Sequence, residues 1–361
     1  MKLLKWCLFL LIITACNNHK TDFVKAEVIS TIIDSLNSKN DIEQFVRGLD
    51  YPVNKFRESK DSIYIHKILS KFELNKIKDF NRDDRFDTDS ITKRIADSIN
   101  VTESFYKADL DNNGFTDLII IGDNKGCQGG ALVNGEYNSC NFSTYALMNF
   151  GNDSINPISL ISEGKRRISI VPKIVNNNKG IFLEIHEPGT YNWIEKQKIS
   201  KNKSYLLTYE FDDLIEFNEN VKSISIDKIE FSTSGCDYKP CPVFELIINK
   251  DKTASFNAIE DNSLIPEILE SYSSNQIKGK FECKIIEKKF NELMSLLDYL
   301  DIPNLKNQYF EDKTHTRNCV LKITYNNGKV KKIEDFGMSG TYGLRKLYKV
   351  MFDLRLTQNW K

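Results

Sequence analysis

The spacing of apolar residues predicts helices in the first part of the chain. Over residues 23–36, apolar side chains recur every four positions, which is typical of an amphipathic helix; they are Val24, Val28, Ile32 and Leu36. A second helix is expected to start near Asp41, with Asn40 or Asp41 as its cap, and a third helix is expected over 63–77. The charged run 81–89 is expected to be a solvated loop.

After about residue 106, short apolar runs alternate with turns rich in Gly, Asn and Asp. Such runs predict strands of an antiparallel sheet; they are 118–121, 145–148, 168–171, 180–185 and 204–209. We therefore expect a domain over 23–220 in which helices precede a sheet.

From about Lys222 the pattern becomes hairpin, helix, hairpin, helix. Strands are expected at 224–231 and in two hairpins, 243–259 and 320–336, whose turns are rich in Asn, Asp and Gly. Helical spacing is found at 290–300 and 344–354. The predicted fold class is therefore α+β, with two domains whose antiparallel sheets have helices packed on one face.

The second unit, residues 222–361, resembles the bacterial family DUF6438. The stretch Cys236–Phe244 (CDYKPCPVF) carries a Cys-Pro pair after an earlier cysteine, and the hairpin, helix, strand and closing helix follow in the same order. The resemblance implies a shared fold over roughly the last two fifths of the chain. It implies no activity, because the family is defined without a function. Cys283 and Cys319 are not part of its pattern.

The first sixteen residues, MKLLKWCLFLLIITAC, resemble the signal peptide of a bacterial lipoprotein. Lys2 and Lys5 precede a short apolar run, and Thr14 and Ala15 stand directly before Cys16, where such chains are cut and lipidated. The apolar run is shorter than the ~20 residues that a spanning helix needs. We expect a signal peptide over 1–16, lipidation of Cys16 and a tether over 17–22. A simple cleaved signal and an uncleaved anchor are the alternatives.

Composition narrows the expected partners. Lys plus Arg and Asp plus Glu both number 50, so the formal net charge is zero, and we see no strongly basic run. Nucleic acid is therefore not expected as a partner. The expected partners are a membrane, reached through the N-terminal lipid, and an envelope protein or glycan. The expected location is the bacterial cell envelope outside the cytoplasm, with the outer membrane favoured over the inner.

Six cysteines remain once Cys7 and Cys16 are set aside. An even number in an exported chain favours disulfides, and neighbourhood suggests three pairs: Cys127 with Cys140, Cys236 with Cys241, and Cys283 with Cys319. A zinc site built from the last four and a redox pair at Cys236 and Cys241 are the alternatives, but neither has C-x2-C spacing.

The sharpest local signal is the stretch 109–117, which reads D-x-D-x-N-G-x-x-D. Calcium needs six or more oxygen ligands, and Gly114 permits a tight turn that brings them together. The predicted ligands are Asp109, Asp111, Asn113, the carbonyl of Phe115, and Asp117.

Strands rather than helices are expected on both sides of this loop, and position twelve is Ile120 where an EF-hand has Glu. The loop therefore resembles the calcium loops of FG-GAP or VCBS-type repeats, in a single copy. One structural Ca2+ is the expected cofactor. The alternative is an Asp/Asn/Gly-rich turn that binds no metal.

No catalytic group is predicted. The histidines that remain after the signal peptide share no metal-ligand spacing, and no serine lies in G-x-S-x-G; these histidines are His19, His66, His186 and His315. The expected function is therefore that of a lipoprotein that binds an envelope partner without catalysis. An extracytoplasmic hydrolase or envelope-modifying enzyme with dispersed residues is the alternative.

Overall fold

The computed structural model describes most of the chain in segments. They are residues 29–49, 69–80, 88–123, 132–133, 136–137, 142–152, 154–161, 170–189, 191–192, 197–198, 201–235, 241–262, 276–310, 317–338 and 340–361. Strands predominate over helices, and nearly all strand pairs are antiparallel. The predicted combination of helices with antiparallel sheets is therefore confirmed.

The first sheet has the order β1-β3-β6-β7, and β2 also pairs with β3. Its strands are β1 (Glu73–Leu74), β2 (Phe105–Ala108), β3 (Asp117–Asp123), β6 (Phe142–Asn149) and β7 (Ile155–Ser159). Every residue of β3 is buried, so this strand is covered on both faces. Leu118 and Ile120 pack with α1 (Ile32–Ser35) and α2 (Lys39–Arg47), while Ile119 packs toward the next sheet.

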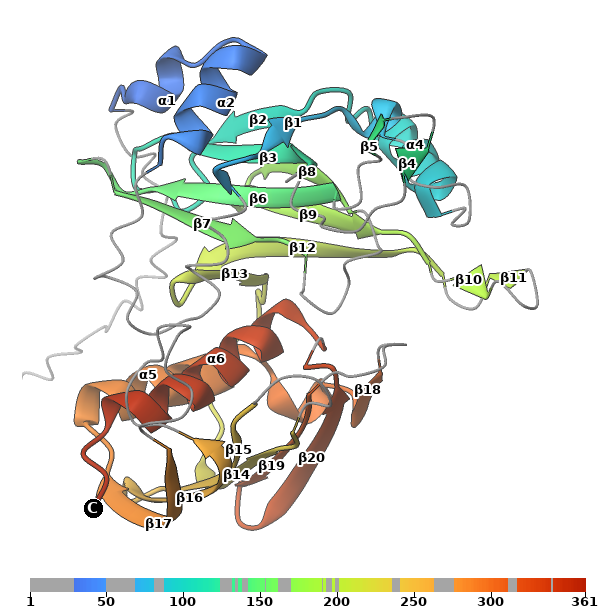
Figure 1. Ribbon diagram of the computed structural model, residues 1–361. Helices are drawn as coiled ribbons and strands as arrows, with labels where there is room; N and C mark the ends of the chain where they lie inside the picture. The colour runs from blue at the N-terminus through green and yellow to red at the C-terminus, as the bar shows by residue number, and fades with distance from the viewer. Residues whose placement is uncertain are drawn as a thin grey trace, which may run out of the picture.

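The second sheet has the order β13-β12-β9-β8 and lies below the first (Figure 1). Its strands are β8 (Val171–Asn177), β9 (Gly180–Glu187), β12 (Lys203–Glu210) and β13 (Asp213–Glu216). Side chains from both sheets form one buried cluster, in which Ala146 and Met148 meet Leu183 and Leu207. Helix α4 (Thr88–Ser98) covers Ile121 and Val171 at one end.

Two short hairpins complete this part of the chain. They are β4 (Leu132–Val133) with β5 (Glu136–Tyr137), and β10 (Tyr191–Asn192) with β11 (Gln197–Lys198).

The third sheet has seven strands in the order β17-β16-β15-β14-β19-β20-β18. They are β14 (Ile226–Thr233), β15 (Val243–Asn249), β16 (Thr253–Asn262), β17 (Ile277–Lys284), β18 (Gln308–Phe310), β19 (Asn318–Tyr325) and β20 (Lys329–Phe336). The expectation of purely antiparallel sheets is wrong at one edge, because β18 runs parallel to β20. The turn η3 (Ile302–Asn304) lies between α5 (Glu287–Tyr299) and β18 and lets the chain enter that edge in the parallel sense.

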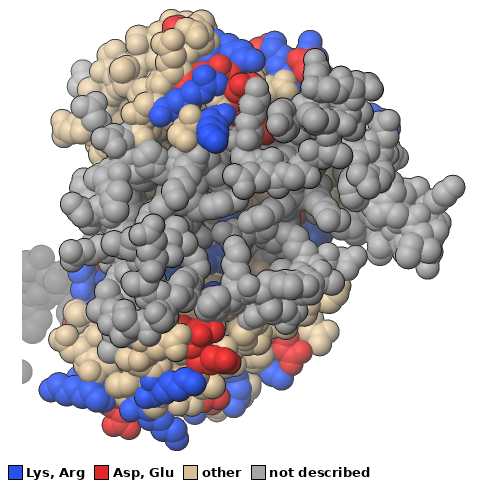
Figure 2. Space-filling view, viewed as in Figure 1, with Lys and Arg blue, Asp and Glu red and all other residues tan. Residues whose placement is uncertain are grey.

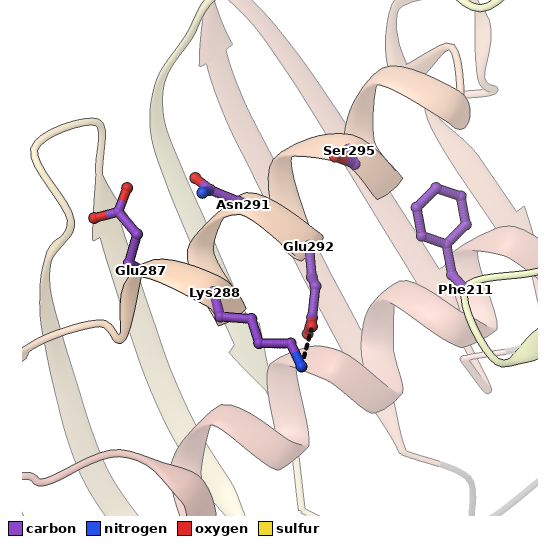
Figure 3. Close-up of a pocket in the computed structure, with 6 residues that line it drawn as sticks. All are labelled: Phe211, Glu287, Lys288, Asn291, Glu292 and Ser295. Atoms are coloured by element: carbon purple, nitrogen blue, oxygen red, sulfur yellow. Dashed lines mark ion pairs between the residues drawn. The ribbon is translucent and has the colours of Figure 1, made fainter.

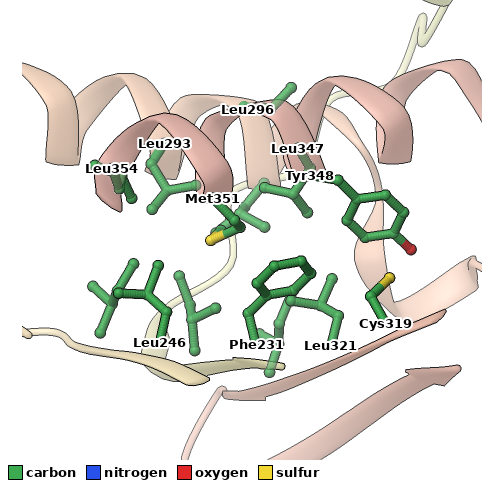
Figure 4. Close-up of a cluster of buried hydrophobic side chains, with 14 of the residues drawn as sticks. Phe231, Leu246, Leu293, Leu296, Cys319, Leu321, Leu347, Tyr348, Met351 and Leu354 are labelled. Carbon is green, nitrogen blue, oxygen red and sulfur yellow. The ribbon is translucent and has the colours of Figure 1, made fainter. Parts of the chain in front are cut away.

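Two helices, α5 (Glu287–Tyr299) and α6 (Tyr342–Thr357), lie across one face of this sheet (Figure 1). Figure 4 shows Leu293, Leu347 and Met351 pointing down from the helices toward Phe231 and Leu321 of the strands. The alternation of buried and half-buried residues along β14 places its apolar side chains on this face, as an antiparallel sheet with one covered face requires.

The start of α6 also contacts the second sheet. The carboxylate of Glu216, at the end of β13, accepts the N–H groups of Tyr342 at 2.7 Å and of Gly343 at 2.8 Å. Thr341 caps the next N–H, that of Leu344, at 3.0 Å. The Tyr342 hydroxyl donates to the carbonyl of Leu160 at 3.1 Å. The bonds to Glu216 and Thr341 satisfy free N–H groups of the first turn of the helix.

Two helix predictions from the opening of the chain need correction. In the described residues, the helix expected over 23–36 is only α1, Ile32–Ser35, because Thr31 and Asp34 form a capping box that starts it there. The Ile29 N–H instead bonds the carbonyl of Gly114 at 2.9 Å. The second helix, α2, starts at Lys39 and is capped by Ser38, not by Asn40 or Asp41; Asp41 is instead the other partner of the capping box.

The helix expected over 63–77 is wrong at its described end. Residues 73–74 form β1, and Ile77–Asp79 form the 3-10 turn η1. Leu74 pairs with Gly122, and a Cβ at Gly122 would lie 2.0 Å from the Glu73 carbonyl oxygen. The sheet can accept this strand because Gly122 has no side chain.

The surface carries charges of both signs. On the face drawn in Figure 2, acidic and basic side chains lie interspersed at both ends of the molecule. Within the described part of the chain, no helix is both long enough and apolar enough to cross a membrane.

Candidate metal centre

The predicted calcium loop joins β2 to β3. The two strands pair in register from Phe105 with Ile120 to Ala108 with Asp117, so the intervening residues form the tip of a hairpin. Asn112 and Gly114 have φ of 56° and 88°, which curl the loop back on itself. The expectation of strands on both sides of the loop is confirmed, and an EF-hand, which needs flanking helices, is excluded.

Three carboxylates meet inside this loop. One ligand oxygen from each of Asp109, Asp111 and Asp117 lies within 4.8 Å of the others. Asp117 is fully buried, whereas the other two are half-buried. No lysine or arginine of the described residues forms an ion pair with any of the three, so the cluster concentrates negative charge without a cationic side chain.

Backbone N–H groups hold these carboxylates in place. Asp117 accepts from Leu110 and from Asn149, both at 2.7 Å. Asp109 accepts from Asn113 at 3.0 Å and from Gly114 at 2.9 Å. Each oxygen of Asp109 and Asp117 therefore has one donor and keeps a further lone pair, which a cation could use.

Burial and mutual repulsion raise two of the pKa values. Burial raises the pKa of Asp117 to about 8. Hydrogen bonds from Asn149 and Leu110 act in the opposite direction, whereas repulsion from the other two carboxylates raises the pKa further. Burial likewise raises the pKa of Asp111 to about 6, with repulsion from Asp109 adding to it. Both shifts express the cost of gathering negative charge in this loop.

The other two predicted ligands brace the loop in this structure. Asn113 donates its amide N–H to Asp111 at 2.9 Å and to the Asn149 carbonyl at 2.8 Å, and its Oδ1 accepts from the Phe115 N–H at 2.7 Å. The ring of Phe115 lies against Gly151. The three carboxylates are therefore grouped, while ligand roles for Asn113 and the Phe115 carbonyl stay predictions.

Asn149 is a residue of this site that the sequence pattern did not reveal. It is 3% exposed and ends β6, directly beside the loop. Its backbone N–H bonds Asp117, its Nδ2 donates to the Thr116 carbonyl at 3.1 Å, and its Oδ1 accepts from Gly151 at 3.0 Å. The only hint in the sequence is an Asn followed by Phe-Gly-Asn after a strand, which by itself predicts a turn.

The N-terminal segment closes over the same loop. The Thr116 hydroxyl donates to Asp34 at 2.6 Å, and Lys107 Nζ donates to the Asp34 carbonyl at 3.1 Å. Asn149 Nδ2 also donates to the Thr31 hydroxyl at 3.2 Å. The loop is thus fixed from three sides, by β2, β6 and the segment that carries α1.

The chemistry of the donors fits a hard cation. Carboxylate oxygens are the ligands that Ca2+ prefers, and it accepts irregular geometry. Asp109, Asp111 and Asp117 would hold the ion, and its charge would offset their repulsion. A catalytic metal would need a nearby base, and the groups of the described residues that hydrogen-bond this cluster are amides and backbone N–H groups.

The third predicted disulfide is wrong. Cys283 and Cys319 are both free thiols, the first half-buried and the second buried. Cys283 lies on β17 and Cys319 on β19, with three strands between them. Neighbouring strands are about 4.8 Å apart, whereas a disulfide requires Cα atoms within roughly 7 Å. The same separation excludes a zinc site that uses both cysteines.

The remaining cysteine predictions stay open. Cys16, Cys127, Cys140 and Cys236 lie outside the described residues, and Cys241 is buried next to Pro242 at the start of β15. Burial raises the pKa of the Cys283 thiol to about 11 and raises that of Cys319 further. Neither thiol is therefore activated as a nucleophile.

Of the histidines considered in the sequence, only His186 is described. It lies on β9, with its Nε2 3.3 Å from a carboxylate oxygen of Glu184. The two side chains come from the same strand, two residues apart, as neighbours on one face of a sheet do. His19, His66 and His315 lie outside the described residues.

An open hollow lies beside α5. Figure 3 shows the exposed side of this helix, where Lys288 forms an ion pair with Glu292 at 4.0 Å, and Phe211 stands at one end. The other lining residues are Glu287, Asn291 and Ser295. A helix-surface ion pair of this kind is typical of a solvated face.

Comparison with protein-family models finds a DUF6438 domain, described as a domain of unknown function, at residues 227–355. This confirms the family resemblance for the C-terminal part, which comprises the seven-stranded sheet and its two helices. No curated protein and no solved structure matches the chain.

Proposed function

We propose that the protein is a lipid-anchored bacterial envelope protein that binds a partner, with one structural Ca2+ in its N-terminal domain. The observation that carries the metal proposal is the convergence of three carboxylates within 4.8 Å in one hairpin loop. The absence of any pairing lysine or arginine among the described residues supports it, because a cation would offset their repulsion.

The proposed ion has a structural role. Its three carboxylates come from the loop itself and from the first residue of β3, a fully buried strand. The same loop contacts Asn149 of β6 and Ile29 of the segment before α1. An ion held here would therefore join β2, β3, β6 and the N-terminal segment.

The proposed location rests on the first sixteen residues. Two lysines, a short apolar run and two small residues before Cys16 support export, cleavage before this cysteine and lipid attachment to it. The outer membrane is favoured over the inner. The proposed partner is an envelope protein or a glycan.

We also propose that the chain comprises two domains, 23–220 and 222–361. Largely separate buried clusters support this division, since most of the third sheet and both of its helices share one cluster, which Ile215 of β13 also joins. The first two sheets contribute to others. The matched family domain begins at residue 227, close to the proposed boundary.

Two experiments on intact cells test the anchor and the binding role. The Cys16→Ser variant should leave the membrane fraction and appear in the soluble fraction, whereas unchanged membrane retention contradicts lipidation. Chemical crosslinking of the wild type followed by purification should yield a discrete partner that Cys16→Ser captures less well. A chain that yields no discrete crosslinked species, but hydrolyses envelope glycans or esters, would contradict a binding role.

A further inference from the structure

A tripeptide recurs in the N-terminal part of the chain. Asp-Ser is followed by Ile or Leu five times, at 34–36, 61–63, 89–91, 97–99 and 153–155. These are all of the Asp-Ser pairs in the sequence, although Ile and Leu together make up only 72 of the 361 residues. All five copies precede the DUF6438 domain. The abundance of Ile and Leu alone does not explain why one of them follows all five Asp-Ser pairs.

A shared local structure does not explain the repeat either. Ser35 and Ser98 are the last residues of α1 and α4, Ser90 lies in the first turn of α4, and Ser154 precedes β7. The copy at 61–63 lies outside the described residues. Since the described serines lie at helix ends, at a helix start and just before a strand, the copies share a sequence and not a conformation.

Two of the serines present their hydroxyls at exposed helix ends. Ser35 and Ser98 are exposed, and each Oγ donates at 2.7 Å to the carbonyl three residues earlier, that of Ile32 or Ile95. The oxygen keeps its lone pairs, so it remains available as a nucleophile. The last residues of a helix also fray easily, which lets an enzyme reach the chain around Ser98 in extended form.

We propose that the Asp-Ser-Ile/Leu tripeptide is an acceptor sequence for O-linked glycosylation, with Ser35 and Ser98 as modified residues. The proposal rests on the export proposed above. Outside the cytoplasm the acceptor meets sugars carried on lipid phosphates rather than nucleoside triphosphates, which favours a glycosyl group over a phosphoryl group. Glycans are bulky and solubilising, and they belong on a surface.

The transfer balances with a lipid-phosphate sugar as donor. Serine Oγ attacks the anomeric carbon, and a C–O bond forms there as the bond from that carbon to the phosphate oxygen breaks. The hydroxyl proton goes to a base of the transferase, and the lipid phosphate leaves. No oxidant or reductant is needed.

Mass spectrometry of the full chain, purified from its own cells, tests the proposal. The intact mass should exceed that of the lipidated chain by multiples of one glycan mass, and peptide fragmentation should place glycans on Ser35 and Ser98. Ser35→Ala and Ser98→Ala should each remove one increment. A mass equal to that of the lipidated chain, or increments of a phosphoryl group, would overturn the proposal.

A matched control lies at Ser223, an exposed serine in the sequence Lys-Ser-Ile. Ser223→Ala should leave the mass increments unchanged, whereas Lys222→Asp should create a new acceptor and add one glycan at Ser223. Failure of Lys222→Asp to add a glycan would contradict recognition of the tripeptide. The N-terminal peptide in the same spectra reports lipidation, so a lipidated chain without sugar defeats this proposal while leaving export intact.

Discussion

The carboxylate of Glu216 accepts the backbone N–H of Gly343 at 2.8 Å. The bond joins the last residue of β13 to the first turn of α6, and so ties the second sheet to the family domain. A negative charge at a helix N-terminus is favourable because unpaired N–H groups concentrate positive potential there. The absence of a side chain at Gly343 also leaves room for Leu300, since a Cβ at this position would lie 2.2 Å from a methyl of Leu300.

Glu216→Ala tests this contact, and Gly343→Ala tests the neighbouring packing against Leu300. Glu216→Ala should lower the free energy of unfolding by about 1–3 kcal/mol, because two N–H groups lose their charged acceptor. Gly343→Ala should also destabilise the protein, through the collision with Leu300. Urea unfolding measures both effects. Glu219→Ala is the control, since Glu219 forms an exposed ion pair with Lys179; an equal loss there would contradict a specific role for Glu216.

A second contact between the same parts predicts acid sensitivity. Lys349 Nζ lies 2.9 Å from a carboxylate oxygen of Asp213. Burial alone would raise the pKa of Asp213, but Lys349 outweighs it and lowers the pKa below its ordinary value. Because the folded pKa is depressed, the stabilisation is present at neutral pH and is lost as pH falls through the folded pKa, below about 3.9.

Lys349→Met should therefore raise the pKa of Asp213 and lower stability at pH 7 by about 1–3 kcal/mol, because a buried charge loses its hydrogen-bonded partner. Urea unfolding at pH 7 and pH 3 measures the difference, which should shrink at the lower pH. Lys346→Met is the matched control, since Lys346 acts on Asp213 only at longer range. An equal effect of the two variants would contradict the role of the ion pair.

The carboxylate loop predicts the opposite pH dependence for protein freed of metal. The raised folded pKa values of Asp111 and Asp117, about 6 and about 8, exceed the unfolded value of about 3.9. The native state therefore binds extra protons between these values, and stability should rise as pH falls from 8 to 5. Thermal unfolding in EGTA measures this. A melting temperature that falls over that range would contradict strain from the gathered charges.

The cysteine assignment predicts a thiol count. In denaturant without reductant, thiol titration of the mature chain should give two groups, Cys283 and Cys319, if the other four form the two remaining predicted disulfides. In the native state Cys319 should react far more slowly than Cys283, because it is 2% exposed and Cys283 is half-buried. Six thiols would contradict both disulfides, and none would contradict the free pair. Cys283→Ser and Cys319→Ser should each remove one group.

Local patterns in the sequence predicted much of the C-terminal part. The hairpins around β15 and β16 and around β19 and β20, and the helices α5 and α6, follow from alternation, turn residues and helical spacing. The parallel strand β18 did not, because three residues at an edge carry no periodicity. The predicted disulfide between Cys283 and Cys319 was wrong because two cysteines that are near each other in sequence can lie on strands that are far apart in the sheet.

The candidate site was predictable only in part. The D-x-D-x-N-G-x-x-D spacing identified the three carboxylates, since all belong to one loop. Asn149 was missed because it reaches the loop through the pairing of β3 with β6, 32 residues from Asp117. Helix α4 was missed although Ile91 and Ile95 have helical spacing, because charged residues just before it favoured a loop.

Calcium-dependent melting of the full chain tests the proposed ion most directly. Protein with Ca2+ at about a hundred times its dissociation constant should gain about 2.7 kcal/mol, so EGTA should lower the melting temperature by several degrees. Asp109→Ala should abolish this response, whereas Asp79→Ala, which removes an exposed carboxylate outside the loop, should retain it. A wild-type melting temperature that is the same in Ca2+ and in EGTA would contradict the proposed calcium site.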